Sequence, residues 1–98
     1  FKHAIKATDK SYPDFALAHL SLGNALLDQG KTAEAIYQYN IAVKLKPGAA
    51  ISHYNLANAL VAQGRNREAI SQYNIALMLW PEYDDARHNL NEILQRSK

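Results

Sequence analysis

Several side chains of this 98-residue sequence could do chemistry, and their spacing decides which chemistry is open to them. His19 and His53 come first, because two imidazoles can share a metal ion that lies about 2.1 Å from each. The two histidines are far apart in the sequence, so each is expected on its own helix. Those helices should be separated by more than one packing distance of about 8–10 Å. We therefore predict a packing role for both histidines and no metal site.

Arrangements for covalent or acid–base catalysis are missing as well. Ser21, Ser52 and Ser71 have no glycines placed to form a nucleophile elbow around them. The four glycines are scattered along the chain, so no loop is built to cradle phosphate. Asp84 and Asp85 are adjacent, which favours a helix N-terminus over a catalytic carboxylate pair. We predict that the chain is not an enzyme and that it uses no cofactor.

Asparagines form a more suggestive pattern. They define what we call the asparagine row: Asn24, Asn55, Asn58 and Asn89. Their offsets along the chain, 3, 31 and 34, place these side chains on one face of successive helices. Each amide offers two donors and one acceptor, so the row could bind the backbone of an extended peptide without reading its side chains. The alternative is that Asn24 and Asn58 only bridge neighbouring helices or bind water.

The helices that would position this row follow from an internal repeat. An offset of 34 aligns segment 16–49 with segment 50–83 without a gap, and 18 of the 34 pairs are identical. Each copy contains two stretches with apolar residues at helical spacing. The repeat therefore predicts two pairs of helices.

The ends of these helices are marked by the same kinds of residue in both copies. Gly30 and Gly64 end the first stretch of each copy. The second stretch stops before a proline, Pro47 or Pro81. Thr32 and Asn66 each lie two residues after the glycine, and we predict that they are the N-caps of the second helices.

The flanking segments fit the same period. Segment 1–15 ends near Pro13, which lies one period before Pro47, and it reads as the second helix of a preceding partial repeat. Segment 84–98 matches the first helix of a repeat but is more polar, which favours a C-terminal capping helix. We therefore divide the chain into a partial repeat 1–15, repeats 16–49 and 50–83, and a capping helix 84–98. This division is typical of a slice of a longer solenoid.

The pattern resembles the tetratricopeptide repeat family, whose 34-residue helix–turn–helix units carry large, small, aromatic and proline residues at fixed places. Repeat 16–49 supplies His19, Leu22, Gly23, Leu26, Ala35, Tyr39, Ala42 and Pro47 at these places. The sequence departs from the family pattern at three positions. It has His19 and His53 where the family usually has tryptophan, and Ala57 where the family usually has glycine. The resemblance implies an all-α superhelix whose first helices line a concave groove. The asparagine row itself resembles one in the repeat domains of O-linked N-acetylglucosamine transferases.

The resemblance also implies the lining of this groove. We expect the asparagine row there together with Leu20, Ser21 and Tyr54, and also Leu17, Leu27, Asp28, Ile51, Val61, Ala62, Asp85, His88 and Glu92. Apolar residues between amides suit an extended or helical peptide. None of these residues is lysine or arginine, so we expect no clamp for the C-terminal carboxylate of a chaperone.

These observations predict a scaffold that binds a peptide or a partner protein in the groove. One alternative is the non-catalytic substrate-recognition repeat domain of a larger glycosyltransferase. Another is a self-assembly module, either through the terminal helices or through Met78 and Trp80, which replace Lys44 and Lys46 of the first repeat. The simpler expectation for Trp80 is packing on the last helix, near Tyr83 or His88.

Composition argues against other partners. Eleven Lys and Arg against nine Asp and Glu give a net charge of +2, too little to favour nucleic acid. The most apolar stretch is too short and too polar to insert into a membrane. There is no cysteine, and therefore no disulfide or thiolate metal site. We expect a soluble chain, with a cytoplasmic location favoured, and the sequence names neither its ligand nor the other domains of its parent.

Overall fold

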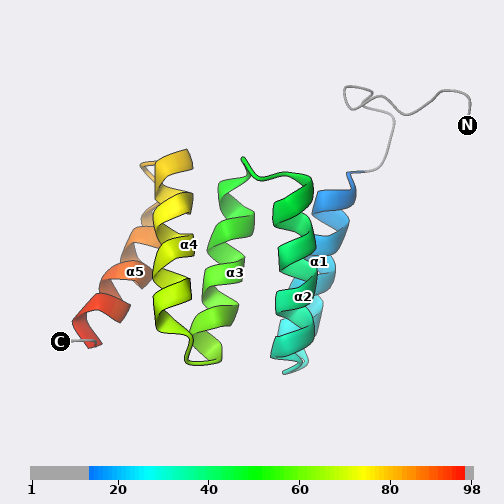
Figure 1. Ribbon diagram of the computed structural model, residues 1–98, viewed down its shortest axis with the longest axis horizontal. Helices are drawn as coiled ribbons and strands as arrows, with labels where there is room; N and C mark the ends of the chain where they lie inside the picture. The colour runs from blue at the N-terminus through cyan, green and yellow to red at the C-terminus, as the bar shows by residue number, and fades with distance from the viewer. Residues whose placement is uncertain (1–13, 97–98) are drawn as a thin grey trace, which may run out of the picture.

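The computed structural model describes residues 14–96, which form five helices and, within that range, no strand. The helices are α1 (Phe15–Asp28), α2 (Thr32–Leu45), α3 (Ala50–Ala62), α4 (Asn66–Leu79) and α5 (Asp84–Arg96). Successive helices run up and down and follow one another along the long axis of the molecule (Figure 1). The predicted all-α repeat superhelix is confirmed. Most of the predicted partial repeat 1–15 lies outside the described residues, and Phe15 is the first residue of α1.

Glycine ends the first helix of each pair, as predicted. Gly30 and Gly64 have φ angles of 80° and 77°, which lie in the left-handed region. The N–H of Lys31 donates to the carbonyl of Leu26 at 2.9 Å, and the N–H of Arg65 makes the matching 2.9 Å bond in the second repeat. This six-to-one hydrogen bond around a left-handed glycine defines a Schellman motif. The turn is therefore set by local sequence and is the same in both pairs.

The predicted N-caps of the second helices are wrong by one residue. Thr32 and Asn66 are the first residues of α2 and α4, and Lys31 and Arg65 occupy the cap positions without a side-chain cap hydrogen bond. The physical reason is the Schellman motif, because its last residue leads directly into the next helix. No residue remains between turn and helix for a separate polar cap.

Close packing within each pair depends on a small residue that faces a tyrosine. A Cβ atom added to Gly23 would lie 2.5 Å from Cε1 of Tyr39, so α1 and α2 approach too closely there for any side chain. Tyr39 is fully buried, and Tyr73 is buried at the same place in the second pair. The second pair has Ala57 in place of glycine and buries it completely. Both pairs thus share one packing scheme around a tyrosine ring.

The histidines join the helices of each pair, in agreement with their predicted packing role. The Nδ1 atom of His53 lies 2.7 Å from Oε1 of Gln72, and its Nε2 atom lies 2.8 Å from the carbonyl oxygen of Pro47. The His19 ring makes the same 2.7 Å contact with Gln38. His53 is buried, and each of its ring nitrogens has a polar partner within hydrogen-bonding distance.

Candidate functional site

The structure brings three members of the predicted site into direct contact. We call the surface formed by α1, α3 and α5 the first-helix face. On it, the Nδ2 atom of Asn89 donates to Oδ1 of Asn58 at 3.0 Å and lies 3.4 Å from the hydroxyl of Tyr54. Asn24 lies one repeat earlier on α1, and Asn55 is half-buried on α3. The asparagine row therefore has a connected part, between α3 and α5, and a separate member on α1.

Tyrosine hydroxyls from the second helices fix two of these amides. The hydroxyl of Tyr39 donates to Oδ1 of Asn24 at 2.5 Å, and the hydroxyl of Tyr73 donates to Oδ1 of Asn58. Asn24 and Asn58 thus do bridge neighbouring helices, as one of the two alternatives expected. Burial raises the pKa of both tyrosines, so their hydroxyls keep the proton that they donate.

These bonds decide which amide atoms remain for a ligand. In Asn24 and Asn58 the oxygen is already used, and no hydrogen bond among residues 14–96 uses Nδ2. In Asn89 the situation is reversed, because Nδ2 is used and Oδ1 has no partner in the described chain. The face thus presents two oriented donors and, beside the second donor, one acceptor.

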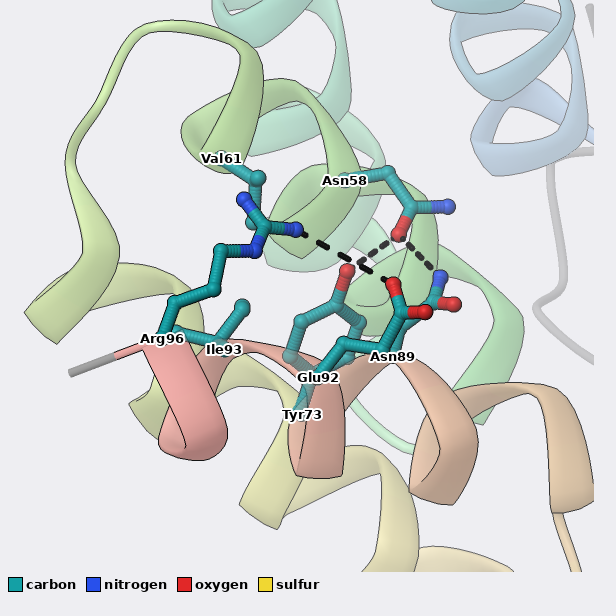
Figure 2. Close-up of a pocket in the computed structure, with 7 residues that line it drawn as sticks. All are labelled: Asn58, Val61, Tyr73, Asn89, Glu92, Ile93 and Arg96. Carbon is teal, nitrogen blue, oxygen red and sulfur yellow. Dashed lines mark hydrogen bonds and ion pairs between the residues drawn. The ribbon is translucent and has the colours of Figure 1, made fainter. Parts of the chain in front are cut away.

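A pocket of about 190 Å³ opens beside this donor–acceptor pair (Figure 2). Its lining comes from α3, α4 and α5 and consists of Asn58, Val61, Tyr73, Asn89, Glu92, Ile93 and Arg96. Val61 and Ile93 give it an apolar wall, while Glu92 and Arg96 place charges beside it. The pocket therefore combines an apolar part with hydrogen-bonding groups of both kinds, as sites for polar organic ligands do.

The expectation that this face lacks basic residues is wrong at its α5 end. Arg96 lines the pocket, and its Nη2 atom lies 3.9 Å from Oε1 of Glu92. Arg96 falls two repeat periods after Asp28, the last residue of α1. The 34-residue period, continued from Asp28 to the last turn of α5, therefore predicts position 96 as part of the same face.

Leu20 also requires a correction. We expected it in the groove, but it is 6% exposed and belongs to the hydrophobic core. Leu17 and Ile51 are exposed apolar residues of this face, at 55% and 50%. Each lies two helical turns before an asparagine of the row and therefore on the same helix face. Ser21 is exposed, as a groove residue must be.

Tyr54 connects the site to a run of aromatic rings. Its ring centroid lies 4.9 Å from that of Tyr83, and Tyr83 lies 4.4 Å from Trp80 in a stacked arrangement. Of the two neighbours expected for Trp80, the structure shows Tyr83, which directly precedes α5. Trp80 nevertheless stays 48% exposed and Met78 77% exposed. Met78 is in the last turn of α4, and Trp80 directly follows that helix. Neither residue lines the pocket.

Residues 14–96 contain no group of three or more metal-ligating side chains close enough to hold an ion. None of the five helices has the length and apolar character required to cross a membrane.

Comparison with known proteins agrees with this architecture. A TPR repeat family model matches residues 23–64, and a tetratricopeptide repeat model matches residues 54–94. The chain belongs to the tetratricopeptide repeat family. No curated protein matches the sequence.

Solved structures share the fold. An O-GlcNAc transferase mutant from Thermobaculum terrenum is 36% identical with a TM-score of 0.79, and the match covers 87% of this chain and 16% of that one. MamA is 26% identical with a TM-score of 0.81, over 90% of this chain and 52% of its own. The second TPR of Spaghetti (RPAP3), bound to an HSP90 peptide, is 24% identical with a TM-score of 0.73. That match covers 83% of this chain and 84% of the other. The chain thus spans about a sixth of the transferase and about half of MamA.

Proposed function

We propose that this chain is a non-catalytic interaction module that binds an extended peptide along the first-helix face. Its family consists of protein-interaction repeats, which supports the general class. The observation that carries the proposal is the fixed orientation of Asn24 and Asn58. Each amide oxygen is held by a buried tyrosine hydroxyl, so each Nδ2 is left as an oriented donor. A peptide carbonyl can accept from such a donor without rearrangement of the site.

The spacing of these donors suits an extended chain. The two asparagines lie on α1 and α3, which contact each other, and packed helices are about 8–10 Å or more apart. An extended peptide rises about 3.3 Å per residue, so carbonyls about three or more residues apart would meet Asn24 and Asn58. Beside Asn58, the free oxygen of Asn89 can accept from a backbone N–H. Leu17, Ile51 and the half-buried Tyr54 would contact apolar side chains of the same peptide.

The test is binding to an array of peptides with blocked ends, because the natural ligand is unidentified. Loss of two hydrogen bonds, at about 1 kcal/mol each, predicts that an Asn24→Ala, Asn58→Ala double variant binds array peptides about tenfold or more weakly. The matched control is the Asn40→Ala, Asn74→Ala variant, since these exposed asparagines are also one repeat apart but lie on α2 and α4. Identical binding by the double variant and the natural chain would refute the proposal.

A second candidate role rests on the likeness to the transferase. The 36% identity over most of this chain supports a substrate-recognition repeat within a larger glycosyltransferase. In that case deletion of residues 14–96 from the parent protein should lower glycosylation of protein substrates and spare small acceptors. A parent protein without transferase activity would remove this candidate.

Self-association remains a separate prediction. The exposure of Met78 and Trp80 supports a contact between copies at the α4–α5 turn. A Met78→Lys, Trp80→Lys variant restores the residues of the first repeat, and sedimentation should show it as a monomer where the natural chain forms larger species. A natural chain that is monomeric at high concentration would exclude this contact. The absence of nucleic-acid binding and the cytoplasmic location also stay predictions.

A further inference from the structure

The asparagine row ends in a carboxylate. Glu92 lies one repeat period after Asn58 and two periods after Asn24, so it occupies on α5 the place that asparagine has on α3 and α1. A ligand that follows the face from α1 to α5 therefore meets two N–H donors and then an acidic group. A carboxylate accepts hydrogen bonds only, so the ligand must supply a donor at this end.

The surroundings of Glu92 leave room for such a donor. Glu92 lines the pocket with Asn58 and Asn89, and its side chain is 56% exposed. Its carboxylate oxygens lie 3.5 Å from Nε2 of His88 and 3.9 Å from Nη2 of Arg96, and these two side chains are 72% and 62% exposed. Ion pairs between exposed side chains contribute little to stability, so an incoming cation can compete for the carboxylate.

The charges beside the first-helix face are mostly acidic, although the whole chain carries +2. Burial raises the pKa of Tyr39, and nearby Asp28 adds to this effect. The pKa of Tyr83 is raised in the same way by burial, with Tyr54 and Asp85 adding to it. Three carboxylates, those of Asp28 on α1 and of Asp85 and Glu92 on α5, thus lie on helices of the first-helix face, and Glu92 alone lines the pocket.

Basic residues are mostly placed elsewhere. Arg96 lines the pocket, whereas the other arginine of α5, Arg87, donates to the carbonyl of Pro81. The remaining basic residues from α2 to α4 lie on the second helices and at their ends, and they are Lys31, Lys44, Lys46, Arg65 and Arg67. The first-helix face therefore favours a cationic ligand over an anionic one.

We propose that the pocket beside Glu92 accepts the cationic side chain of a lysine or arginine from an extended peptide whose backbone is bound by the asparagine row. This inference rests on the proposed function and names its ligand class. The aliphatic stem of the cationic side chain would lie against Val61 and Ile93, as long basic side chains do on apolar surface. Its charged end would bind Glu92 and compete with Arg96.

The experiment uses peptides with acetylated and amidated ends, so that no terminal charge contributes. At each position of a neutral peptide that binds in the array, lysine, glutamine or glutamate is placed in turn, and fluorescence anisotropy gives the affinity. At one position lysine should bind about fivefold more tightly than glutamine, as expected for about 1 kcal/mol. The Glu92→Gln variant should lose this preference, and Glu92→Lys should favour glutamate at the same position.

The control is Glu34→Gln, which removes an exposed carboxylate from α2 and should leave the lysine preference intact. Circular dichroism confirms that each variant is folded. Peptides that bind the natural chain without a lysine preference would overturn this inference alone, as would a preference that survives Glu92→Gln. Failure of every peptide to bind would overturn the proposed function together with it.

Discussion

His53 is hydrogen-bonded on both sides of its ring, with Nδ1 2.7 Å from Oε1 of Gln72 and Nε2 2.8 Å from the carbonyl of Pro47. A carbonyl oxygen can only accept, so Nε2 carries a proton. The ring thus links α3, α4 and the turn that precedes α3. Arg87 lies one repeat period after His53, and Pro81 lies one period after Pro47. Arg87 donates to the carbonyl of Pro81, so an arginine takes the place of histidine at this turn.

Replacement of His53 by alanine should therefore destabilise the fold. The variant leaves the Gln72 amide and the Pro47 carbonyl without their partner, at a cost of about 1–3 kcal/mol for a buried unsatisfied group. Thermal unfolding followed by circular dichroism measures the loss. His88→Ala is the control, because the His88 side chain is 72% exposed and its removal should change the unfolding temperature little. Equal melting of both variants would contradict a structural role for His53.

Gly23 should not tolerate even one added methyl group. The Gly23→Ala variant places Cβ 2.5 Å from the ring of Tyr39, which must shift, and overpacking of this kind costs about 1–3 kcal/mol. Chemical denaturation should show this loss. Gly48→Ala serves as the comparison, because an added Cβ meets nothing within 4 Å there. A variant at Gly23 as stable as the natural chain would show that α1 and α2 separate easily.

Removal of one hydroxyl should affect both stability and binding. In Tyr73→Phe the ring still fills the core, and the lost hydrogen bond to Asn58 costs about 1 kcal/mol of stability. The amide of Asn58 loses the bond from α4 that orients it, so affinity for array peptides should also fall. Tyr37→Phe is the control, because that ring is 66% exposed on α2. Unchanged affinity for Tyr73→Phe would show that the hydroxyl does not orient the donor.

The stability of the fold should fall at alkaline pH. Burial raises the pKa of Tyr83 to about 12 from its ordinary value of 10.0, with smaller contributions from Tyr54 and Asp85. Between these values the unfolded chain releases the proton and the folded chain keeps it, so rising pH favours unfolding. Denaturation midpoints measured from pH 9 to 11.5 should therefore decrease. Tyr83→Phe should flatten this decrease, and an unaltered slope would contradict the assignment to Tyr83.

The sequence period predicts the helices well because their ends depend on local chemistry. Gly30 and Gly64 adopt the left-handed conformation that few other residues tolerate, so the first helix of each pair must end there. The caps at Lys31 and Arg65 were not predictable from cap preferences, since the last residue of the Schellman turn itself occupies the cap position.

The candidate site is predictable only in part, because side-chain burial depends on neighbouring repeats. Leu20 shares its place in the repeat with Tyr54, yet the leucine is buried and the tyrosine half-buried. The pairing of each asparagine with a tyrosine 15 residues later is visible in the sequence of both repeats, but which amide atom it uses requires the structure. Arg96 enters the pocket through the last turn of α5.

The hydrogen bonds of Asn58 and Asn89 have a consequence for the direction of a bound chain. Asn58 on α3 has a free N–H, and Asn89 on α5 has a free oxygen within the described residues. In an extended strand the N–H and C=O of one residue point to the same side, with the N–H nearer the N-terminus. A residue that satisfies both amides must place its carbonyl over α3 and its N–H over α5. A peptide bound in this way runs antiparallel to the order of the repeats, with its N-terminal part over α5 and its C-terminal part toward α1.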